Sequence, residues 1–134
     1  MAYNPIVSPL PVAVQEINSG GASIKNYVSG ALTGDEVPVA TGSSKITGWY
    51  IFNGAASVAR ISFYDAVSAP IIGDTGASFK FSIVIPAGSA ANVSLPAGVQ
   101  FTTGISFNIG SAVDNSDPAG IGATTVSVNV IYKA

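Results

Sequence analysis

The chain has 134 residues, of which 48% are apolar and only 9% carry a charge, so the simplest organisation is a single domain with a neutral surface. Its five basic and seven acidic residues are scattered singly and leave a net charge of −2, which excludes the clustered Lys and Arg that nucleic-acid binding needs. The absence of cysteine excludes disulfides and thiol chemistry and favours intracellular synthesis.

No membrane segment or secretion signal is predicted. The apolar runs are of strand length and never approach the roughly 18 residues of a membrane-spanning helix. The first residues, MAYNPIVSPLPVAV, lack a basic start, and prolines interrupt their apolar stretch, so they do not resemble a signal peptide.

Residues 1–21 are predicted to form an extended, proline-rich N-terminal arm, because prolines interrupt any helix there. Residues 12–17 alternate weakly and are a possible edge strand. The arm has two interpretations: a loosely packed chain end, or a segment that reaches onto a neighbouring subunit. In the second interpretation the candidate contact residues are Pro5, Pro9, Pro11, Val12 and Val14.

The segment 22–45 is less regular, because Gly or Pro interrupts it every four to five residues. Within it, Asp35-Glu36 stands between Gly34 and Val37-Pro38 and predicts a turn. As a catalytic pair it is poor, since adjacent residues on an extended chain point in opposite directions.

From residue 46 onward, side chains alternate between apolar and polar as in half-buried strands. Trp49 and Ile51 are expected to share one face of the first strand, opposite Tyr50 and Phe52, and Asn53-Gly54 then predicts a hairpin. Further strands are predicted over 58–64, 79–85, around 93–95, over 99–101 and 105–109, and over 126–132.

The inward sets of these strands are apolar. In the strand over 58–64, Ile61 and Phe63 are expected inward and Arg60 and Ser62 outward. In the strand over 79–85, the inward set is Phe79, Phe81, Ile83 and Ile85.

The predicted fold is all-β. About eight short strands, separated by Gly and Pro turns and without a helical pattern, indicate an antiparallel β-sandwich that is jelly-roll-like. We therefore expect a single β-sandwich domain over residues 22–134, preceded by the extended arm.

Reactive side chains are scarce, so no enzymatic activity and no cofactor are expected. Without His or Cys, the remaining catalytic groups are carboxylates, Lys and hydroxyls, and no Ser-x-x-Lys motif occurs. None of the carboxylates lies in a catalytic motif; they are Glu16, Asp35, Glu36, Asp65, Asp74, Asp114 and Asp117. Gly73-Asp74-Thr75-Gly76 matches the aspartic protease triplet, but it occurs once in a short chain and is interpreted as a turn.

Two weaker possibilities concern ligand binding. Asp114 and Asp117 lie in an oxygen-rich stretch that favours a turn, with a weak Ca²⁺ site as the alternative. Trp49, Tyr50 and Tyr64 are expected to be core residues, with a sugar-stacking platform as the alternative.

The order of motifs from residue 46 to the end resembles small β-rich structural proteins of tailed phages. It runs GWYIFN, ARISFYDA, APIIGDTG, FSIVIPAG, LPAGVQFTTGISFNI, an Asp-rich loop and VSVNVIYKA. The matching positions are Tyr64-Asp65, Pro70 to Thr75, Ile85-Pro86 and Gly98 to Gly104. The resemblance covers about two thirds of the chain, and residues 1–45 carry none of it.

This resemblance implies a virion component made in the host cytoplasm, namely a capsid decoration or cement protein. Such a protein binds the major capsid protein at junctions between its subunits and is often a homotrimer on the capsid surface. The resemblance carries no catalytic residue. The alternatives are a tail or fibre module that recognises host-surface carbohydrate, and a carboxylate hydrolase.

Overall fold

A computed structural model describes residues 21–30, 35–71, 76–111 and 125–134. These residues form eight strands and no helix. The strands are β1 (Ser23–Val28), β2 (Asp35–Thr41), β3 (Ser44–Asn53), β4 (Ala59–Tyr64), β5 (Phe79–Ile85), β6 (Ser89–Phe101), β7 (Gly104–Gly110) and β8 (Val126–Lys133).

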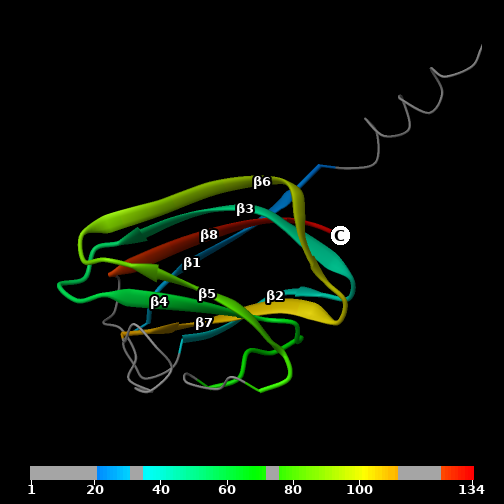
Figure 1. The fold of residues 1–134 in the computed structure, drawn as a ribbon, viewed down its shortest axis with the longest axis horizontal. Helices are drawn as coiled ribbons and strands as arrows, with labels where there is room; N and C mark the ends of the chain where they lie inside the picture. Colours follow the sequence, from blue (N-terminus) through cyan, green and yellow to red (C-terminus); the bar gives the residue numbers. More distant parts are fainter. Residues whose placement is uncertain (1–20, 31–34, 72–75, 112–124) are drawn as a thin grey trace, which may run out of the picture.

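The strands are arranged as two stacked, antiparallel sheets of four (Figure 1). One sheet has the order β1-β8-β3-β6 and the other the order β2-β7-β4-β5. Except for β4 and β5, which pair within one sheet, successive strands therefore cross from one sheet to the other, as they do in the two Greek keys of a jelly roll. The predicted all-β antiparallel sandwich is confirmed, and the strand order is that of a jelly roll.

The core lies between the two sheets and is built from alternate residues of the central strands. Trp49 stacks on Phe63 of the opposite sheet, with ring centroids 6.2 Å apart, and Phe63 in turn stacks on Phe81 at 5.1 Å. The fully buried aliphatic residues include Ile51, Ile61, Ile105, Ile109, Val126, Val128 and Val130. Because aromatic rings and β-branched side chains have few rotamers, this core is stiff as well as apolar.

The segment 35–41 differs from the sequence prediction. Asp35 and Glu36 do not form a turn; they begin β2 and pair with Ile109 and Asn108 of β7. The partner strand comes from about 70 residues further along the chain, so local composition could not reveal this pairing.

The predicted hairpin at Asn53-Gly54 is also wrong. β3 and β4 belong to different sheets, so the chain crosses between the layers at this point. The buried Asn53 side chain stabilises the crossing: its Nδ2 donates to the carbonyls of Ser57 at 2.9 Å and Ile85 at 3.0 Å, and its Oδ1 accepts from Ala55 N at 3.0 Å. Asn therefore serves here as a hydrogen-bonding corner residue.

The strand over 79–85 is interrupted near its start. The register between β4 and β5 shifts between Phe63 and Tyr64, so that Phe79 pairs with Tyr64 and packs edge-on against its ring. Lys80 consequently lies over the ring of Phe101, with Nζ 5.5 Å from the ring centroid. Phe79 therefore does not share the inward face of Phe81, as had been predicted, because a bulge reverses the alternation.

The turn between β6 and β7 is closed by the carboxylate of Asp65, which follows β4. Its oxygens accept hydrogen bonds from the backbone N–H groups of Thr102 (3.1 Å), Thr103 (2.7 Å) and Gly104 (3.2 Å), and from Thr102 Oγ1 at 2.9 Å. Partial desolvation raises the pKa of this carboxyl, but the hydrogen bonds outweigh it and lower the pKa from 3.8 to about 2.

Replacing Asp65 by Asn should destabilise the fold above pH 4, on the order of 1–2 kcal/mol after allowance for solvent screening. Because the folded-state pKa lies below the unfolded value, the ionised carboxylate stabilises the protein above about pH 4, and this contribution is lost as the pH falls to about 2. Chemical denaturation at several pH values should show a difference between Asp65→Asn and wild type that shrinks towards pH 2. Glu36→Gln, at an exposed carboxylate that takes no part in closing this turn, provides the matched control substitution. A constant difference at all pH values would contradict this role.

Candidate interaction surface

The outer faces of the two sheets differ sharply in exposure. On the β2-β7-β4-β5 sheet, polar side chains of the two central strands are buried, each at most 1% exposed: Arg60, Ser62, Tyr64, Ser106 and Asn108. The chain that follows β4 lies against this side (Figure 1), and Asn108 Nδ2 donates to the Pro70 carbonyl at 2.9 Å. This outer face is therefore covered around β4 and β7.

This burial corrects the expectation that β4 is half exposed. Every residue of β4 is buried, including the charged Arg60, whose Nε donates to Ser62 Oγ at 3.1 Å. A buried guanidinium is costly unless it is hydrogen-bonded. The alternating pattern correctly marked Ile61 and Phe63 as inward, but it could not show that a second layer covers the polar side.

The outer face of the β1-β8-β3-β6 sheet is open. It exposes large apolar side chains: Ile24 is 66% exposed, Tyr50 54%, Phe52 51% and Val28 44%. We call the outward residues of the four strands the open face. They are Ile24, Asn26 and Val28 of β1; Ser127, Asn129 and Ile131 of β8; Gly48, Tyr50 and Phe52 of β3; and Ala90, Asn92 and Ser94 of β6.

The strand register arranges the open face in rows that run across the sheet. The middle row is Asn26, Asn129, Tyr50 and Asn92. One flanking row is Val28, Ser127, Phe52 and Ala90, and the other is Ile24, Ile131, Gly48 and Ser94. Asn26 Nδ2 donates to Asn129 Oδ1 at 2.7 Å, so part of the amide row is held in place within the sheet.

None of these side chains is a carboxylate, an imidazole, a thiol or an ammonium group. A row of amides and a phenol lies between rows that contain Phe, Ile, Val and Ala. Depletion of charge with exposed aromatic residues is typical of the centre of a protein interface. This combination can bind another surface by burial.

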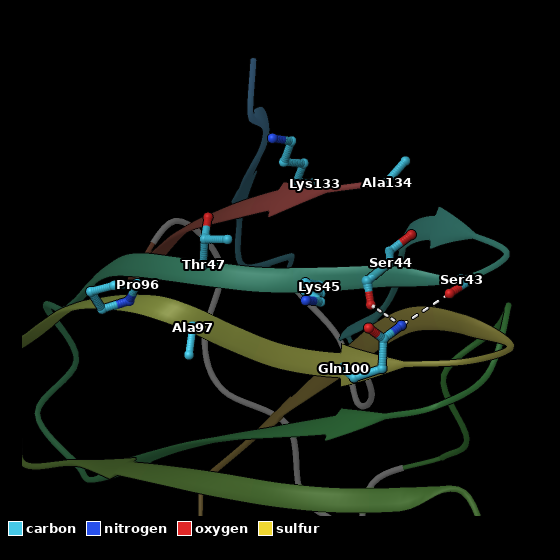
Figure 2. Close-up of a pocket in the computed structure, with 9 residues that line it drawn as sticks. All are labelled: Ser43, Ser44, Lys45, Thr47, Pro96, Ala97, Gln100, Lys133 and Ala134. Atoms are coloured by element: carbon cyan, nitrogen blue, oxygen red, sulfur yellow. Dashed lines mark hydrogen bonds between the residues drawn. The ribbon is translucent and has the colours of Figure 1, made fainter. Parts of the chain in front are cut away.

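Beyond the open face, the same sheet ends in a pocket of about 390 Å³ (Figure 2). Lys45 and Lys133 lie opposite each other in the register of β3 and β8 and both line it. Gln100 Nε2 donates to Ser43 Oγ at 3.0 Å and to the Ser44 carbonyl at 3.2 Å, as the dashed lines show. The lining side chains include no carboxylate, imidazole or thiol.

Gly48 allows β3 and β6 to approach closely at the border of the open face, next to a shift in strand register. The register of both pairings of β3 changes between Ile46 and Gly48. A Cβ atom on Gly48 would lie 2.7 Å from the Val93 carbonyl oxygen, too close for any other residue. Gly48 thus gives the flanking row of Ile24, Ile131 and Ser94 one flat position without a side chain.

The three aromatic residues suggested as a sugar-stacking platform do not lie together on one surface. Trp49 is 8% exposed and lies in the core, Tyr64 is fully buried on the other sheet, and only Tyr50 is on the open face. The sequence analysis did not identify Tyr50 and Phe52, which lie side by side on the outer face of β3, as a surface feature. The alternation of these two residues with Trp49 and Ile51 already indicated that they share a face. The strands that extend this surface on both sides of β3 follow only from the strand order.

Several predicted residues lie outside the part of the chain that the structure describes. They are the arm residues Pro5, Pro9, Pro11, Val12 and Val14, the carboxylate Asp74, and the possible calcium ligands Asp114 and Asp117. Within the described ranges, no group of three or more His, Cys, Asp and Glu residues could hold a metal ion. Nor does any described helix have the length and hydropathy to cross a membrane.

The unusual pKa of Asp65 marks a structural role. Perturbed carboxyls are often catalytic, but here the turn that Asp65 closes accounts fully for the lowered pKa. The open face therefore stands as the candidate functional feature of the described residues. Comparisons of this chain with family models, with curated proteins and with solved structures find no match.

Proposed function

We propose that this protein is a non-enzymatic structural component of a phage virion, a capsid decoration or cement protein that stabilises the head. It would bind the major capsid protein at junctions between capsid subunits and act as a homo-oligomer, for which the motif resemblance suggests a trimer. The observation that carries the proposal is the open face, which exposes apolar side chains and no charge on a rigid jelly roll.

The physical argument links the surface to the task. A cement protein works by burying surface against its neighbours, so it needs a stiff scaffold and low desolvation cost. Charged groups are expensive to bury without partners, whereas apolar groups and amides that find hydrogen bonds are not. A chain with only 9% charged residues meets this requirement over most of its surface.

The N-terminal arm is the proposed capsid contact. The described chain begins at Gly21, immediately before β1, and β1 is an edge strand of its sheet. Residues 2–17, with Pro5, Pro9 and Pro11, have a composition suited to an extended segment that lies across another subunit or adds to the edge of its sheet. Proline also reduces the entropy that such a segment loses on binding.

Deleting residues 2–17 should weaken attachment to capsids while leaving the sandwich folded, because the deletion removes none of the eight described strands, of which β1 begins at Ser23. Co-sedimentation of wild type and the deletion with capsids that lack the protein measures attachment, and thermal unfolding checks the fold. We expect at least about a tenfold loss of affinity if the arm contributes an ordinary share of the contact. Unchanged attachment of a folded deletion variant would rule out the arm as the contact.

The copy number in purified virions tests the function itself. A decoration protein should be present in numbers comparable to the major capsid protein, which quantitative mass spectrometry can measure against capsid peptides. Absence from particles would refute a virion role. A copy number that is a small multiple of three or six would instead place the protein in the tail.

Recognition of host-surface carbohydrate by a tail or fibre module is the second candidate. The neighbouring exposed rings of Tyr50 and Phe52, flanked by Asn92 and Asn129, favour it, because aromatic faces and amides suit sugar rings and hydroxyls. Binding to a panel of host glycans should then be lost in Tyr50→Ala and kept in the distant Val84→Ala. Trp49 is buried in the core, so its fluorescence is a poor reporter of sugar binding at this face.

A further inference from the structure

We propose that the open face binds the open face of a second copy of this chain, about a two-fold axis that runs along the middle row. This inference concerns self-association alone and does not depend on the proposed virion function. The pairing gives a dimer, or a hexamer if the trimer suggested by the resemblance also forms.

The first argument is electrostatic. When two identical faces meet about a two-fold axis, a charged group near the axis approaches its own copy. Such a contact between like charges is unfavourable. The open face carries no charged side chain: Lys45 and Lys133 lie beyond it at one end, and Lys25 of β1 alternates with Ile24 and Asn26 and pairs with the inward Val130. With a net charge of −2, the whole chain also repels its own copies only weakly.

The second argument is hydrogen bonding. A two-fold axis along the middle row places each of its residues opposite the same residue of the second copy. Asn26, Asn129 and Asn92 suit this arrangement, because a side-chain amide carries both donors and an acceptor and can bond to a copy of itself. A row of carboxylates or ammonium groups could not do so.

The third argument is shape. The same axis exchanges the two flanking rows, so each residue of one flanking row faces the residue of the other flanking row on the same strand of the second copy. Phe52 then faces Gly48 of the second copy, and Ala90 faces Ser94 of the second copy. On β1, Ile24 faces Val28 of the second copy, which buries two side chains that are 66% and 44% exposed. Stacked sheets pack in this way at a separation of about 10 Å.

The area indicates the strength of the contact. Strands lie about 4.8 Å apart and alternate residues about 6.8 Å apart, so the four strands and three rows cover roughly 400 Å² per copy. A standard stable interface buries about 800 Å² per partner. We therefore expect reversible association with a dissociation constant on the order of 1–100 μM, rather than a permanent dimer.

The other large apolar side chains exposed in the described residues are those of Val67, Ile71 and Val84, and none of them lies on the open face. On the opposite sheet, the polar side chains of β4 and β7 are covered, and Val84, which is 43% exposed, lies on the edge strand β5. It is therefore a matched control position: an exposed apolar residue at the outer side of a strand, away from the open face.

Sedimentation velocity of the full chain from about 1 μM to about 1 mM tests the pairing, in the concentration range set by the expected affinity. Wild type should shift reversibly to a species with an even number of copies. Tyr50→Lys should weaken this association by at least about tenfold, because the two introduced ammonium groups face each other across the axis. Val84→Lys should associate as wild type does, and thermal unfolding should confirm that both variants are folded.

A charge exchange makes the test specific for the axis. Tyr50→Glu should also fail to pair with itself, but an equimolar mixture of Tyr50→Lys and Tyr50→Glu should associate again, and added salt should weaken the mixed pair. Wild type that stays monomeric or purely trimeric throughout would overturn the proposal. So would failure of the mixture to associate, or glycan binding at this face without self-association.

Discussion

The alternation of side chains along β3 is the constraint on which the rest of the structure depends. β3 is central in its sheet, pairing with β8 on one side and β6 on the other. Trp49 and Ile51 point inward and join the two layers, while Tyr50 and Phe52 point outward and form the middle of the open face. A slip of one residue would exchange these sets, placing a phenol in the core and the indole in water.

Gly48 is required for this strand register at one position in β3. Only Gly48 permits the approach of β6 at the irregularity between Ile46 and Gly48, where a Cβ atom would meet the Val93 carbonyl oxygen at 2.7 Å. Beyond this point the three paired strands run in register to the end of β3, which keeps the rows of the open face aligned. The core and the surface are thus two consequences of one strand pairing.

Polar side chains in this fold mainly hold the connections between strands. The Asn53 side chain is hydrogen-bonded to backbone groups at the crossing from β3 to β4, and the Asp65 carboxylate to backbone N–H groups of the turn between β6 and β7. Both satisfy backbone groups that the sheets leave unpaired, which matters in a sandwich whose chain changes layers repeatedly. The covered outer face adds Arg60, Ser62 and Asn108, whose hydrogen bonds lie within the protein. The open face differs because its polar groups are amides directed outward.

The sequence by itself determined the fold class, the approximate strands from residue 46 onward and the inward position of residues such as Ile61 and Phe63, because period-2 alternation is a local property of the chain. It also placed Tyr50 and Phe52 together, opposite Trp49 and Ile51. Only the tertiary structure decided that Asp35 and Glu36 belong to a strand, that Asn53-Gly54 crosses between sheets, and that Arg60 is buried. The open face likewise depends on β1, β8 and β6 lying beside β3. These features arise from pairing between segments up to about a hundred residues apart, and no local pattern encodes which distant strand will supply the partner.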